Sequence, residues 1–126
     1  MVRHVIALYL AIGGAAGAIA RYYVQGWVVD VVGPSAWGTF AVNVAGAFFL
    51  GFFLTVTEER FLVPSLYRTF VAVGFLGSFT TFSTLMWESQ QLLSVGDALG
   101  AMANLAGSVV AGVAAVYLGV SAGRLV

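Results

Sequence analysis

Hydroxyl side chains gather in one short stretch of this chain, within residues 74–85. Five of them fall within seven positions: Ser78, Thr80, Thr81, Ser83 and Thr84. Hydroxyl groups donate and accept hydrogen bonds, so they can replace part of the water shell of a small ion. Glycine, serine and threonine are also poor helix formers. Because two glycines lie beside the cluster, we expect a helix that breaks between Gly77 and Thr80.

A helix break inside a membrane would supply two kinds of backbone group. Freed carbonyl groups suit a cation, and freed N–H groups suit an anion. The uncharged stretch 69–87 is centred on residue 78, which places the break near the middle of a membrane span. Broken backbone at that depth is tolerated only inside protein or against a polar cavity. The alternative interpretation is that the hydroxyl groups only pack helices together.

Asn43 lies among small residues in another apolar stretch. Helical periodicity places it on one face with Gly46 and Ala47, and it places Phe48 and Phe52 on the opposite face, which we expect to meet lipid. The amide of Asn43 must find partners inside the membrane. It either contacts a moving ion or makes an interhelical hydrogen bond that only holds helices together.

The last apolar stretch and the first one hold further polar candidates. Asn104 and Ser108 share a small, polar helix face near the C-terminus. Arg21 lies within the first apolar stretch, where a guanidinium is expensive. It either attracts an anion or extends to the membrane interface.

The remaining composition excludes several classes of function. The chain has no cysteine and a single histidine, His4, which excludes disulfides, thiolate metal sites and a histidine dyad. It has no lysine, so it offers no basic patch for nucleic acid. No set of nucleophile, base and orienting group is present, so we do not expect an enzyme.

Lipid must cover most of this protein. Its 126 residues are 61% hydrophobic and 8% charged, whereas a soluble chain carries about 25% charged residues. The gaps between charged residues are long enough for spanning helices, which need about 20 apolar residues. We predict an all-α integral membrane protein, a single four-helix domain over 1–126, with spans near 4–26, 37–57, 67–93 and 98–122.

The arginines predict the orientation of these spans. Arg3, Arg60, Arg68 and Arg124 fall on the side of the N-terminus, and Arg21 lies near the opposite side. By the positive-inside rule the N-terminus is expected in the cytoplasm. No ionisable residue lies in the middle of a span, so the interior offers neutral donors and aromatic edges. That favours passive movement of a small anion over proton-coupled transport.

Three motifs in this chain resemble those of the Fluc (CrcB) fluoride channels, and the resemblance extends over all four predicted helices. They are Gly13-Gly14-x-x-Gly17-Ala18-x-x-Arg21-Tyr22, Gly38-Thr39-x-x-Val42-Asn43-x-x-Gly46, and Gly74-Phe75-x-Gly77-x-x-Thr80-Thr81-Phe82-Ser83-Thr84. The resemblance implies a multi-pass protein of the cell inner (plasma) membrane that exports fluoride passively and relieves its toxicity. It also implies an antiparallel, dual-topology homodimer with two pores.

The resemblance further implies roles for individual residues. A structural sodium ion (Na+) at the dimer centre would be held by the backbone carbonyls of Gly77 and Thr80. Asn43 and Phe82 match pore-lining positions, Ser108 lies on a polar track of the last helix, and Arg21 resembles a vestibule arginine. The expected fluoride pathway comprises Arg21, Asn43, Thr81, Phe82, Ser83, Thr84, Leu85, Asn104 and Ser108.

Two residues depart from the family pattern, and other interpretations stay open. Leu85 stands where the family usually has a second pore phenylalanine, and Asn104 stands where it often has tyrosine. The uneven arginine count leaves room for a heteromeric partner of opposite orientation. A small multidrug-type transporter is a second candidate, although residues 5–20 lack the carboxylate that it needs. A structural membrane subunit is a third.

Overall fold

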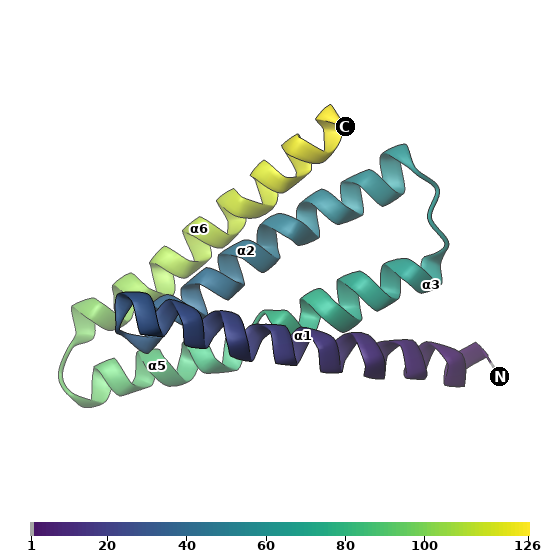
Figure 1. Cartoon of the computed structure of the whole chain (residues 1–126). Coiled ribbons are helices and arrows are strands. Elements are labelled where there is room, and N and C mark those ends of the chain that lie inside the picture. The colour runs from purple at the N-terminus through teal and green to yellow at the C-terminus, as the bar shows by residue number, and fades with distance from the viewer. Residues whose placement is uncertain (1) are drawn as a thin grey trace.

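The computed structural model describes residues 2–126, and within them four long helical spans run back and forth through the molecule (Figure 1). Each is long and apolar enough to cross a membrane, which confirms the predicted all-α membrane fold. The third span consists of four consecutive segments. The elements are α1 (Val2–Val32), α2 (Ser35–Thr55), η1 (Val56–Arg60), α3 (Ser65–Arg68), η2 (Thr69–Leu76), α4 (Gly77–Phe79), α5 (Phe82–Ser94) and α6 (Ala98–Leu125).

Glycines end two of the spans. Gly33 (φ 107°) and Gly96 (φ 82°) adopt the left-handed conformation that other residues avoid. After α5, the Gly96 N–H bonds to the Leu93 carbonyl and the Asp97 N–H to the Leu92 carbonyl, which is the Schellman arrangement. The Asp97 side chain then caps α6 by accepting the Gly100 N–H at 2.8 Å. The spans thus turn at these two glycines.

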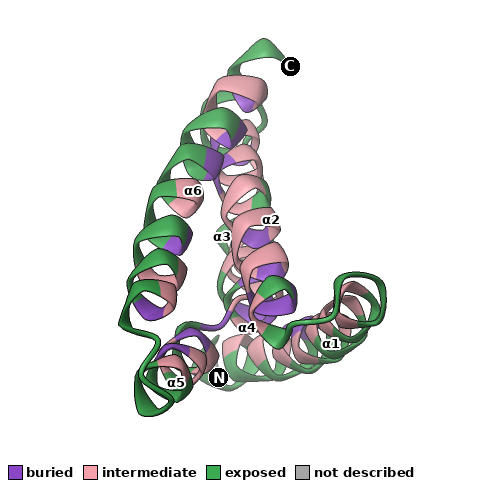
Figure 2. Ribbon diagram, turned by 90° about the vertical axis from the view of Figure 1, so that its left-hand side faces the viewer, coloured by how far each residue is buried: buried purple, intermediate pink, exposed green. Residues whose placement is uncertain are grey.

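The second span packs along α6 and meets α1 on its other side, whereas the third span passes from behind α2 to the lower end of α6, where α5 lies (Figure 2). Glycines bring α6 close, because a Cβ on Gly119 would overlap the Phe48 carbonyl and one on Gly123 would lie 3.1 Å from the Phe52 carbonyl. The α6 helix therefore passes over the side of α2 that the sequence assigned to lipid. That expectation for Phe48 and Phe52 is wrong, and both are only partly exposed.

The first span packs on the third through its own glycines. Gly13 and Gly17 are buried, and a Cβ on Gly17 would overlap the Phe75 carbonyl in η2. Small residues allow this close backbone approach, on which helix association in lipid depends.

The third span is interrupted at two consecutive residues. Thr80 (φ −87°, ψ 156°) and Thr81 (φ −148°, ψ 111°) are extended, between α4 and α5. Gly77 (φ −62°, ψ −32°) is still helical. The break was predicted between Gly77 and Thr80. The interruption thus begins at Thr80, the last residue of that range, and not at Gly77.

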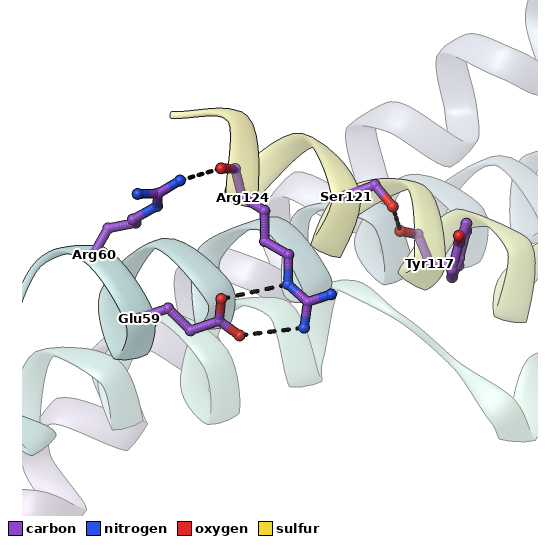
Figure 3. Close-up of polar contacts among 5 residues, drawn as sticks. All are labelled: Glu59, Arg60, Tyr117, Ser121 and Arg124. Carbon is purple, nitrogen blue, oxygen red and sulfur yellow. Dashed lines mark hydrogen bonds and ion pairs between the residues drawn. The ribbon is translucent and has the colours of Figure 1, made fainter.

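The described chain begins and ends on the same side of the molecule (Figure 1), and three arginines near that side make polar contacts. Arg68 Nη1 lies 2.9 Å from Glu58 Oε1, and Arg124 Nε lies 3.4 Å from Glu59 Oε2. Arg60 donates to the Arg124 carbonyl (Figure 3). These contacts fasten the η1 end of the second span to α3 and to the end of α6.

Candidate functional site

The side chain of Asn43 bonds to the backbone at the interruption of the third span. Asn43 Nδ2 donates to the Thr81 carbonyl at 3.0 Å, and the Thr81 N–H donates to Asn43 Oδ1 at 2.6 Å. One amide on α2 therefore satisfies two backbone groups that leave the helical pattern. This is the interhelical hydrogen bond that the sequence left open as one role for Asn43.

The hydroxyl cluster arranges the start of α5. The Thr84 N–H donates to Thr81 Oγ1 at 3.3 Å, and Thr81 Oγ1 donates to Thr84 Oγ1 at 2.9 Å. Ser83 Oγ lies 3.4 Å from Thr81 Oγ1. Thr81 is thus an N-cap residue for α5, and its hydroxyl satisfies one of the N–H groups that a helix start leaves free.

A surface groove of about 310 Å³ opens beside this interruption. We call it the break groove; the predicted site residues that line it are Asn43, Gly77, Thr80, Thr81, Phe82 and Leu85. The two apolar side chains in this predicted set differ, because Phe82 is 75% exposed and Leu85 is 6% exposed. The structure therefore brings four of the nine predicted pathway residues and both predicted sodium ligands to one place.

Asn104 and Ser108 line a different groove. This Trp37 groove of about 390 Å³ is also lined by Trp37 and Phe40. Asn104 Nδ2 donates to Ser89 Oγ at 3.1 Å. Ser108 is 8% exposed, and its buried hydroxyl has no partner among residues 2–126. Six of the nine residues of the expected pathway thus lie in two separate grooves of the single chain.

Arg21 lies outside the residues that line either groove. It is half-buried on α1, one turn before Gln25. The predicted vestibule arginine therefore lies near a third polar group, which the sequence did not single out.

That group links three spans through Gln25, Thr39 and Glu88. Gln25 Nε2 donates to Thr39 Oγ1 at 3.1 Å, and Thr39 Oγ1 donates to Glu88 Oε1 at 2.8 Å. Glu88 Oε2 is buried and has no partner among the described residues. The expectation of a wholly neutral interior is therefore incomplete, since one carboxylate lies among the helices.

The spacing of residues could have revealed this link. Thr39 precedes Asn43 by one helical turn on α2, and Glu88 follows Thr84 by one turn on α5. The two faces meet, so the Thr39–Glu88 and Asn43–Thr81 contacts form one polar seam between α2 and α5.

The interruption offers opposite partial charges on its two sides. The C-terminal end of α4 presents carbonyl groups, and the N-terminal end of the 13-residue α5 presents N–H groups with the positive end of its dipole. Residues 2–126 contain no cluster of three or more His, Asp or Glu side chains. A cation at this site would therefore meet backbone carbonyls.

The family described as CrcB-like protein, Camphor Resistance (CrcB), matches residues 8–120. The chain is 40% identical over 120 residues to the fluoride-specific ion channel FluC of Geotalea daltonii, with 94% of this chain and 97% of that protein covered. It is 45% identical over 115 residues to the protein of the same name from Opitutus terrae, with 89% and 87% covered.

Proposed function

The chain belongs to the CrcB-like protein family, and we propose that it is a fluoride channel. It is a multi-pass membrane protein, and in the cell inner (plasma) membrane it would let fluoride leave passively and so relieve fluoride toxicity. One observation supports this most directly: Asn43 and Thr81 hold a broken helix beside a hydroxyl-lined groove. The named relatives are channels, and channels are not a class of enzyme.

Fluoride is small and strongly hydrated, so a pathway must replace its water with donors. The hydroxyls of Ser83 and Thr84 and the first N–H groups of α5 can supply them. The exposed ring of Phe82 can present its positive edge to an anion. Asn104 and Ser108 would supply donors along the other groove. None of these groups carries a fixed charge, which allows the ion to leave as well as enter.

The proposed assembly is an antiparallel homodimer of dual topology. In one chain the break groove is open, and both Phe82 and Gly77 are exposed on its wall. A second copy in the opposite orientation would cover this groove and complete two pathways. The four arginines at one end instead favour a single orientation, so the orientation of the termini tests the homodimer against a heteromeric partner.

The residues of the interruption fit a structural sodium ion. Neutral oxygen ligands without a nearby carboxylate suit a monovalent hard cation better than calcium. Gly77 and Thr80 line the break groove at the carbonyl end of α4. When bound, sodium would neutralise the partial negative charge of these carbonyls where two chains meet.

Growth of a fluoride-sensitive bacterial strain tests the proposed function. The strain lacks its own fluoride exporter and carries this chain on a plasmid. We expect growth in fluoride concentrations that stop the strain with an empty plasmid, and no gain of resistance to quaternary ammonium drugs. Drug resistance without fluoride resistance would favour a small multidrug-type transporter, and neither resistance would favour a structural subunit.

A further inference from the structure

The third span is interrupted where one backbone N–H group, that of Thr81, bonds to a partner outside its own helix. In a continuous α-helix the Thr81 N–H would bond to the carbonyl of Gly77, four residues earlier. It donates instead to Asn43 Oδ1 at 2.6 Å. The preceding N–H, of Thr80, still bonds to the Leu76 carbonyl in the helical pattern, at 3.1 Å. The helical bonding therefore stops at the bond that Asn43 replaces.

We propose that Asn43 is a positioning residue for the cation site. By accepting the Thr81 N–H, it keeps the Gly77 carbonyl available as a ligand for sodium. This inference rests on the proposed function, since the sodium site is part of that proposal. It gives Asn43 a role separate from direct contact with fluoride.

Thr81 is buried, so it matters which group accepts the hydrogen bond of its N–H. Thr81 is 6% exposed, and a buried backbone N–H needs an acceptor. The Thr81 hydroxyl is already engaged at the start of α5. Without Asn43 Oδ1, the acceptor that regular helical winding offers is the Gly77 carbonyl. Loss of the amide would therefore direct the N–H to a cation ligand.

A second bond and close packing fix this arrangement. Asn43 Nδ2 donates to the Thr81 carbonyl at 3.0 Å, so both peptide groups of Thr81 are held by one amide. One turn later on α2, Gly46 leaves no room for a Cβ, which would overlap Thr80 Cγ2. The α2 helix thus lies directly against the interruption and sets its geometry.

The sodium dependence of thermal stability tests this role without measuring flux. The purified protein is unfolded in detergent at increasing sodium chloride, with N-methylglucamine chloride keeping the ionic strength constant. For the native chain we expect stabilisation by sodium. For Asn43→Ala we expect half-maximal stabilisation to need at least about tenfold more sodium, the scale of one lost hydrogen bond to a charged or buried group.

Two variants distinguish loss of the acceptor for the Thr81 N–H from a general loss of stability. Asn43→Asp keeps an oxygen that can accept the Thr81 N–H but loses the Nδ2 donor, so its sodium requirement should rise less than that of Asn43→Ala. Asn104→Ala removes the other interior amide, which bonds to Ser89 in the Trp37 groove, and should leave the sodium requirement unchanged. If Asn43→Ala does not fold, Asn43→Ser replaces it, because its shorter side chain cannot reach the same N–H.

The outcomes distinguish this inference from the proposed function. An unchanged sodium requirement in Asn43→Ala overturns the inference. So does a native protein that conducts fluoride but is not stabilised by sodium, and that result leaves the channel proposal intact. A native protein that conducts no fluoride, yet loses its sodium response in Asn43→Ala, supports the inference and refutes the channel.

Discussion

Gly46→Ala adds one methyl group at the contact between α2 and the interruption of the third span. The new Cβ would overlap Thr80 Cγ2 and lie 3.3 Å from Phe79 Cδ1. Carbon atoms prefer separations of about 3.5–4.0 Å. The Thr80 side chain is held by the bond from its hydroxyl to the Leu76 carbonyl, so we expect α2 to move away by roughly 1 Å. Asn43 is one turn away on the same helix, and its bonds of 2.6 and 3.0 Å to Thr81 would then exceed hydrogen-bond length.

The expected change in the stability of Gly46→Ala combines two opposing contributions. Overpacking costs about 1–3 kcal/mol, and replacing glycine by alanine within a helix returns up to about 1 kcal/mol. We expect a net destabilisation of about 1–2 kcal/mol from these two terms. We also expect fluoride flux to fall about tenfold or more, because the polar seam loses both bonds between Asn43 and Thr81, each worth about 1 kcal/mol.

Thermal unfolding in detergent and fluoride efflux from liposomes measure the two effects of Gly46→Ala. The matched control is Gly26→Ala on α1, where a Cβ would meet nothing within 4 Å. The control should keep native flux and native or slightly higher stability. Native stability and native flux in Gly46→Ala would refute the close packing of α2 on the interruption.

Other substitutions test separate parts of the structure. Phe82→Leu should slow fluoride flux severalfold and Leu85→Phe should quicken it severalfold, on the scale of about 1 kcal/mol for an aromatic contact. Native flux of both variants in the liposome assay would exclude aromatic coordination of fluoride. Thr39→Val leaves the carboxylate of Glu88 without its hydroxyl partner, so the thermal unfolding assay should show a loss of about 1–3 kcal/mol, and no loss would contradict the importance of this bond. Arg124→Ala removes an exposed ion pair and should cost less than about 1 kcal/mol in the same assay, whereas a larger loss would show that the end of α6 is fastened more strongly than its exposure indicates.

Local patterns in the sequence predict the spans because hydrophobicity and charge act over short distances. Long uncharged stretches predict four helices, and the structure confirms them. The hydroxyl cluster predicts a break, but it does not specify the residue at which the helix stops. That depends on Asn43, which lies 38 residues from Thr81 along the chain.

Helix periodicity predicts which side chains share a face but not which neighbour covers that face. For this reason the sequence assigned Phe48 and Phe52 to lipid, although α6 passes over them. It also joined Asn104 to Asn43 in one pathway, whereas the single chain places them in separate grooves. Glu88 was not singled out, because its place in the polar seam depends on its partner Thr39 on α2.

Efflux from liposomes under matched fluoride and chloride gradients tests the central claim most directly. The purified protein is reconstituted without any other protein, and valinomycin with potassium carries the compensating charge. A passive fluoride channel predicts rapid fluoride efflux that needs no proton gradient, together with chloride efflux no faster than from protein-free liposomes. Equal efflux of both anions, or no fluoride efflux from liposomes that contain the folded protein, would contradict the account.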